Sequence, residues 1–196
     1  MNSLNLSNTY DNDQIKETSR SLRKLYFIRA SFSVAWVILV FAFAKHNPRL
    51  ASFLFVIYPL WDAIATLIDL KSSLSGQSKT PQYVNAAISI ITTVAVVLAL
   101  QNSIPDALIV FGIWAILTGL IQLILALSRR KQFGGQWPMI ISGGQSMLGG
   151  SSFIILAHAP TSGINSLAGY AAFGAFYFLL AAIRLTKAAG KATLSV

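Results

Sequence analysis

An uncharged segment of 22 residues, from Ala107 to Ser128, constrains the fold of this chain more than any other sequence feature. At 1.5 Å per residue, a helix of about 20 apolar residues crosses the roughly 30 Å hydrocarbon core of a bilayer. Asp106 precedes the segment, and the basic run Arg129, Arg130, Lys131 follows it. A buried helix of a soluble protein is the alternative, but such a helix usually has about half this length. The segment therefore predicts a transmembrane helix whose basic end faces the cytoplasm.

The composition extends this interpretation to the whole chain. Of the 196 residues, 55% are hydrophobic and 11% are charged, whereas about 25% of the residues in a typical soluble protein are charged. The net charge of +9 is found in many nucleic-acid-binding proteins, but here the basic residues lie at the ends of apolar segments. We therefore expect the lipid bilayer, with anionic headgroups at the cytoplasmic face, as the partner of these charges, and no nucleic acid.

Six apolar segments of transmembrane length follow one another along the chain. They are 25–44, 50–70, 82–101, 107–128, 137–157 and 166–186. The polar segment 1–19 is interpreted as a flexible cytoplasmic tail, and 188–196 as a cytoplasmic C-terminal tail. The first apolar segment starts too late and is too long for a cleaved signal peptide, so we expect it to be retained. The fold class predicted for residues 20–187 is an all-α, polytopic six-helix bundle.

The positions of Lys and Arg predict the orientation of this bundle. With six spans, the N-terminal tail, the loops 71–81 and 129–136, and the C-terminal tail share one side of the membrane. Twelve basic residues belong to those segments and the helix ends beside them, against Lys45 and Arg49 on the opposite side. Because cytoplasmic loops carry an excess of Lys and Arg, both termini are predicted to be cytoplasmic.

The spacing of a few residues predicts three copies of one helical hairpin, over 25–70, 82–128 and 137–186. An aromatic residue precedes a proline by 22, 22 and 23 residues in the pairs Tyr26–Pro48, Tyr83–Pro105 and Trp137–Pro160. Asp62, Gly119 and Gly174 each lie 14 residues beyond one of these prolines. Parallel repeats of this kind are related by an axis along the membrane normal, so we expect the three hairpins to superpose.

The chain resembles the HdeD-type acid-resistance membrane proteins in three segments, WAILTGLIQLILALSRRK, QWPMIISGGQSMLGGSSFIILAHAP and LAGYAAFGAFYFLLAAIRLTK. The likeness covers about residues 25–187 and is strongest from residue 105 onward. It implies a fold of repeated helical hairpins and a link to acid or envelope stress, and it carries over no catalytic residues. We expect the chain to lie in a bacterial inner membrane. Asp62 and the polar N-terminal segment depart from the family pattern.

The sequence contains none of the motifs HExxH, GxSxG or the phosphate-binding loop, and it has no cysteine, so we expect no enzyme, no cofactor and no metal site. The glycine-rich stretch 143–152 lies inside an apolar span and is interpreted as a helix-packing surface. Small residues allow helix backbones to approach closely in a membrane. The residues expected to serve this packing are Ser142, Ser146, Gly150, Gly119 and Gly174.

Polar residues within the predicted spans form the candidate site. Asp62 lies about 12 Å and Arg29 about 6 Å from the cytoplasmic boundary, by the rise of a helix. Asp69 is seven residues after Asp62 and near the same helix face. Gln122 and Gln145 lie at about 9 Å and 12 Å. A carboxylate in the membrane costs roughly 2.5 kcal/mol or more, so it is normally paired or faces a cavity.

Two interpretations of these residues stay open. Arg29, Asp69 and Arg184 are expected to extend toward the headgroups, but Asp62 lies too deep for its short side chain to do so. Asp62 either pairs with Arg29, which would keep it ionised, or belongs to a solute or proton site. The corresponding functions are a non-catalytic stress-related membrane protein and a small-solute or proton transporter. The sequence leaves homo-oligomerisation and a membrane partner open.

Overall fold

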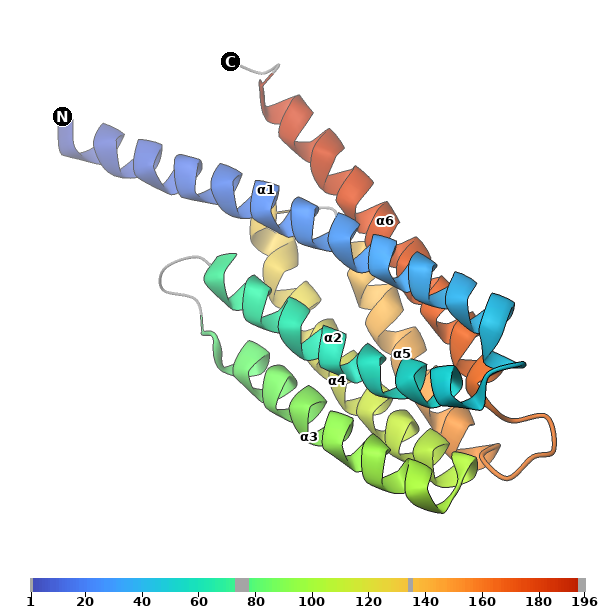
Figure 1. Cartoon of the computed structure of the whole chain (residues 1–196). Coiled ribbons are helices and arrows are strands. Elements are labelled where there is room, and N and C mark those ends of the chain that lie inside the picture. The colour runs from blue at the N-terminus through green and yellow to red at the C-terminus, as the bar shows by residue number, and fades with distance from the viewer. Residues whose placement is uncertain (1, 73–77, 134–135, 194–196) are drawn as a thin grey trace.

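The computed structural model describes residues 2–72, 78–133 and 136–193, which form six α-helices and one π-helical segment (Figure 1). The helices are α1 (Asn2–Leu39), α2 (Pro48–Ser72), α3 (Thr80–Asn102), α4 (Ile104–Phe133), α5 (Trp137–Ile155) and α6 (Ile164–Thr193), and the π-helical segment η1 (Val40–Ala44) extends α1. The prediction of an all-α protein is confirmed. The start of α1 and the end of α6 lie at the same end of the bundle (Figure 1).

Five of the helices are long and apolar enough to cross a membrane. These spans are Lys16–Ala44, Pro48–Lys71, Thr80–Asn102, Ile104–Lys131 and Ile164–Thr186. The remaining helix, α5, is not among these spans, and its 19 residues include four glycines and four serines. The structure therefore supports a multi-pass membrane protein, and the sixth span stays a prediction.

Prolines and capping side chains explain where several helices begin. Pro48 starts α2, and the Asn47 side chain accepts a hydrogen bond from the Leu50 N–H at 3.0 Å. Ser103 ends α3 in an extended conformation, and its hydroxyl accepts from the Asp106 N–H at 3.1 Å to cap α4. Proline is favoured in a first turn because the N–H that it lacks has no partner within the helix there. The short connections follow directly from these start signals.

The helices form a ring in chain order. Each packs against its neighbours in the sequence, and α6 closes the ring along α1. The most extensive contacts join α4 to α5 and α1 to α6, which are helices of different predicted hairpins. The equivalence of the three hairpins therefore stays a prediction. In a ring of this order, α2 and α5 lie on opposite sides of the interior.

The bundle carries its apolar side chains outside and many polar ones inside, as α3 illustrates. Its inward face has a polar residue every three or four positions, at Gln82, Asn85, Ser89 and Thr92. Its outward face exposes Ile90, Ile91, Val94 and Leu98. A soluble protein rarely exposes so large an apolar surface, whereas lipid chains cover it without cost. The arrangement agrees with a bilayer as the surrounding solvent.

Two apolar clusters occupy the ends of the interior. The larger lies toward the η1–α2 turn and contains interlocking aromatic rings, with Phe111 in contact with Phe55, Tyr58, Trp114, Phe153 and Tyr170. The smaller lies toward the basic end and includes Leu22, Tyr26, Met139 and Leu185. The space between these clusters is where the polar side chains meet.

The ends of the chain differ from the expected tails. α1 already begins at Asn2, so residues 2–19 continue the first helix where we expected a flexible segment. Once the membrane-embedded part is helical, extending the helix avoids the costly nucleation step, and 1–19 contains no proline or glycine to stop it. α6 likewise continues to Thr193, into the predicted tail 188–196, where alanines favour helix.

Glycines allow α4 and α5 to approach most closely. A Cβ atom on Gly119 would lie 2.7 Å from Ser146 Cβ, and one on Gly150 would lie 2.5 Å from the Gly112 carbonyl oxygen. A Cβ on Gly143 would lie 2.7 Å from the Gly119 carbonyl oxygen. No Cβ atom fits at such distances, so the backbones themselves form the contact. Backbone contact of this kind increases dispersion interactions where water exclusion contributes nothing.

Gly143 and its neighbour Gly144 provide a matched test of this packing. A Cβ on Gly144 would meet nothing within 4 Å. We expect Gly143→Ala to destabilise the fold by roughly 1–3 kcal/mol through overpacking. Gly144→Ala should leave stability unchanged or raise it by up to about 1 kcal/mol, because alanine favours helix. Thermal unfolding in detergent, followed by tryptophan fluorescence, measures both, and equal melting temperatures for the two variants would contradict the packing.

Candidate functional site

A polar cavity of about 120 Å³ lies inside the ring and reaches both apolar clusters. All six helices contribute polar side chains to its lining, with one example from each in Arg29, Asp62, Asn85, Gln122, Gln145 and Tyr177. This volume has room for several water molecules or one small solute. The lining combines these polar side chains with a larger apolar area, so the cavity offers both hydrogen bonds and apolar contacts to an occupant.

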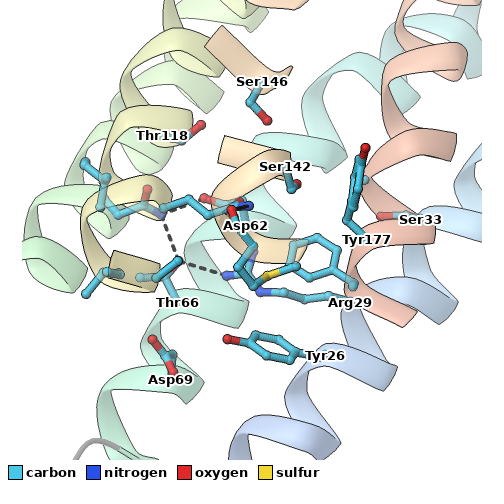
Figure 2. A pocket seen from close by; sticks show the side chains of 18 of the residues that line it. Tyr26, Arg29, Ser33, Asp62, Thr66, Asp69, Thr118, Ser142, Ser146 and Tyr177 are labelled. Atoms are coloured by element: carbon cyan, nitrogen blue, oxygen red, sulfur yellow. Dashed lines mark hydrogen bonds and ion pairs between the residues drawn. The ribbon is translucent and has the colours of Figure 1, made fainter. Parts of the chain in front are cut away.

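The Asp62 carboxylate lies at the centre of the site (Figure 2). Arg29 Nη1 donates to Asp62 Oδ1 at 2.7 Å, which makes an ion pair between α1 and α2. Asp62 Oδ2 accepts from Asn85 Nδ2 and from Ser89 Oγ, each at 2.8 Å. Both charged side chains keep 15% of their surface exposed. The carboxylate is therefore held by three donors and remains accessible from the cavity.

Further contacts extend this network to α4 and α6. Trp114 Nε1 donates to Ser89 Oγ at 2.9 Å, so Ser89 links the indole to the carboxylate. Thr66 Oγ1 accepts from Arg29 Nη2 at 3.1 Å and from Asn85 Nδ2 at 2.9 Å. The Arg29 guanidinium also lies 5.4 Å from the centre of the Phe178 ring, a cation–π contact. The network thus connects five of the helices.

Helical periodicity brings these side chains to one place. Asp62, Thr66 and Asp69 are spaced by four and then three residues, and Asn85 and Ser89 by four, so each set lies on one helix face. The ion pair is necessary for burial, because an isolated charge in a low-dielectric interior costs several kcal/mol. Arg29 and the polar donors around Asp62 compensate that cost within the bundle.

A second ion pair lies between this network and the basic end of the bundle. Arg129 Nη2 donates to Asp69 Oδ2 at 2.7 Å, and both side chains are only 8% exposed. Nearby, the Tyr26 hydroxyl donates to Gln136 Oε1 at 3.3 Å, and Figure 2 shows Tyr26 and Asp69 on the same side of the Asp62 network. Tyr26, Asp69 and Arg129 also line the cavity, so this layer forms its wall toward the end of the bundle where α1 starts and α6 ends.

On the opposite side, hydroxyl pairs border the aromatic cluster. Ser33 Oγ and Tyr58 Oη lie 3.3 Å apart, and the Tyr170 hydroxyl donates to Ser146 Oγ at 3.2 Å. Beyond them the rings of the larger apolar cluster pack against one another. The polar interior therefore ends at the aromatic layer.

The structure distributes the predicted polar residues over one cavity and two ion pairs. Asp62 and Arg29 pair directly, and Gln122 and Gln145 line the same cavity. Gln122 also donates to the Met139 carbonyl oxygen at 3.1 Å. Asp69 pairs with Arg129. Arg29 and Asp69 therefore do not extend to the headgroups as we expected, because each has an oppositely charged partner inside the bundle.

The residues predicted for helix packing divide into two groups. Gly119 and Gly150 lie at the α4–α5 contact. Ser142, Ser146 and Gly174 line the cavity, and Ser146 belongs to both groups because it also faces Gly119 at the α4–α5 contact. Arg184, which is exposed, places its guanidinium 4.9 Å from the centre of the Trp137 ring at the basic end.

Sequence reasoning missed Thr66, Ser89, Trp114 and Arg129 as members of the site. The polar stripe along α3, from Gln82 through Thr92, was a usable signal, because polar side chains at helical spacing in an apolar span must face inward. Thr66 was a second usable signal, because it lies between the intramembrane residues Asp62 and Asp69. The sequence predicts a loop position for Arg129, because this residue begins the run of three cations. Only its contact with Asp69 distinguishes Arg129 from the two cations that follow it.

The side chains that line the cavity are suited to holding a small molecule. Among the described residues, no three histidine, aspartate or glutamate side chains gather in one place, and each cavity carboxylate has an arginine partner. The cavity can surround a small molecule with hydroxyl, amide and guanidinium groups and with aromatic faces. No protein-family profile, curated protein or solved structure matches the chain.

The Arg29–Asp62 pair leads to a stability prediction. Arg29→Leu leaves the buried carboxylate uncompensated and should lower the free energy of unfolding by about 3–5 kcal/mol. The double variant Arg29→Leu/Asp62→Leu removes both charges and should recover most of that loss. Arg184→Leu, an exposed arginine outside the cavity, is the control and should change stability little. If Arg29→Leu were no more damaging than the control, the pair would have no role in holding α1 and α2.

Proposed function

We propose that this chain is a non-catalytic, six-span protein of a bacterial inner membrane, with both termini in the cytoplasm. Five helices meet the length and apolarity of membrane spans, and α5 fills the ring position between α4 and α6. A five-span arrangement would leave that ring position outside the bilayer. The excess of Lys and Arg at one end of the bundle supports the orientation and contact with anionic lipids.

Within this frame we propose that the cavity around Asp62 binds a small polar solute on its way through the membrane. The single observation that supports this function is the Arg29–Asp62 pair, accessible from a polar cavity between two apolar clusters. Ionisable groups inside a membrane are costly and typically mark a substrate or ion pathway. A purely structural bundle could replace the pair with apolar side chains at no loss of stability.

The residues have distinct roles in this proposal. Arg29 presents hydrogen-bond donors to the solute, and Asp62 holds Arg29 in place. Asn85, Ser89 and Trp114 hold Asp62 in turn. In this proposal the Asp69–Arg129 layer and the aromatic cluster act as gates on the two sides of the cavity, and passage requires each to open at a different time.

A non-transporting role under acid or envelope stress is the second candidate. The resemblance to HdeD-type proteins supports it, and so does the aromatic cluster, which packs between the cavity and the η1–α2 turn. In that role the two ion pairs only hold the helices together. The two candidates differ in whether substitution at Asp62 changes flux or only stability.

Reporter fusions test the topology. Alkaline phosphatase, active only outside the cytoplasm, should be inactive after Val196 and after Lys131. It should be active when fused after Ser162, in the connection between α5 and α6. Activity after Val196 together with inactivity after Ser162 would mean that α5 does not cross, and would overturn the six-span proposal.

Flux measurements in proteoliposomes test the transport proposal. Wild-type protein should accelerate the equilibration of glycerol, followed by light scattering, or of protons, followed by an enclosed pH-sensitive dye. Asp62→Asn should reduce that rate roughly tenfold, the equivalent of about 1.4 kcal/mol, at equal protein content. Gly144→Ala is the matched control with no effect. Equal flux in protein-containing and empty liposomes would favour the non-transporting candidate.

A further inference from the structure

The cavity has two chemically different walls. The first wall, on α1, α2 and α3, carries the ion pair with its donors. The second, on α5 and α6, carries Ser142, Gln145 and Tyr177, which line the same cavity (Figure 2 shows Ser142 and Tyr177). Residues of both walls line the one cavity of about 120 Å³, so a molecule inside it can contact both.

The second wall has hydrogen-bonding capacity that the protein itself does not use. Within the described part of the chain, the Ser142 hydroxyl, the Gln145 amide and the Tyr177 hydroxyl bond to no other protein group. Arg29 adds to this capacity, because a guanidinium has five N–H donors and only Asp62 and Thr66 accept from it here. An occupant with both donors and acceptors would satisfy these groups.

The charges at the cavity cancel. Asp62 is paired with Arg29 and Asp69 with Arg129, so the four ionised side chains that line the cavity sum to zero. A charged occupant would leave an uncompensated charge in a low-dielectric interior, which is strongly unfavourable. A neutral occupant would leave the balance intact.

We propose that the cavity is selective for a small, net-neutral solute that carries both hydrogen-bond donors and acceptors. The Arg29–Asp62 pair gives one polar contact and the Ser142, Gln145 and Tyr177 wall gives the other. Trp61, Trp114 and Phe178 provide apolar faces for the rest of the molecule. This selectivity rests on the proposed solute-binding function and adds the chemical class of the solute.

Three probes of similar size and different charge test the selectivity: propionamide, propionate and butylammonium. Ligand-observed NMR on full-length protein in nanodiscs measures their dissociation constants. Wild-type protein should bind propionamide at least tenfold more tightly than either ion. Asp62→Asn leaves Arg29 uncompensated, so it should reverse the preference toward propionate. Arg29→Gln leaves Asp62 uncompensated and should shift the binding preference toward butylammonium.

Controls separate failure of the selectivity from failure of the binding function. The double variant Asp62→Asn/Arg29→Gln carries no unpaired charge and should recover the preference for propionamide. This variant still tests the selectivity if one of the single variants folds poorly. Arg184→Gln lies outside the cavity and should behave as wild type. Wild-type binding of either ion as tight as that of propionamide would overturn the inferred class and leave the cavity as a solute site. Binding of no probe by wild type or variants would overturn the solute-binding function itself.

Discussion

The pairing of Arg29 with Asp62 is the interaction on which the interior of this bundle depends. Their 2.7 Å contact compensates two charges that the surrounding apolar medium could not solvate. The compensation needs further polar groups, because a carboxylate has more acceptor positions than one arginine fills. Asn85 and Ser89 occupy those positions, and Trp114 positions Ser89. One intramembrane carboxylate therefore explains why α3 turns a polar face inward and why α4 presents its indole there.

Away from the cavity, cohesion comes from close packing. Lipid chains are as apolar as the exposed side chains, so burying those side chains between helices would gain little. α4 and α5 instead bring their backbones together at Gly112, Gly119, Gly143 and Gly150. The aromatic rings around Phe111 fill the interior toward the η1–α2 turn. Because a hydrophobic driving force between the helices is absent in lipid, close packing holds them together at one place and polar contacts hold them together around the cavity.

The position of the cavity connects these features to function. Two ion pairs lie on its walls, and an aromatic cluster borders it on the side toward the η1–α2 turn. Each charge is matched, so the site is electrically neutral while remaining rich in donors and acceptors. In the selectivity that we propose, the site distinguishes solutes by charge before it distinguishes them by shape, because the cost of an unmatched charge exceeds that of an imperfect hydrogen bond.

The sequence by itself determined the helical class, the apolar segments within the helices and the inward location of Asp62, because hydropathy and proline signals are local and lipid cannot solvate a carboxylate. It left the choice between a paired and an unpaired Asp62 open. Only the tertiary structure decided which residues meet: Arg129 with Asp69, Ser89 with Asp62 and α6 with α1. Those contacts depend on how each helix is rotated about its axis, and that rotation is set by packing among all six helices. The linear pattern of apolar and polar residues therefore predicts the rotation of each helix less well than it predicts where the helices lie along the chain.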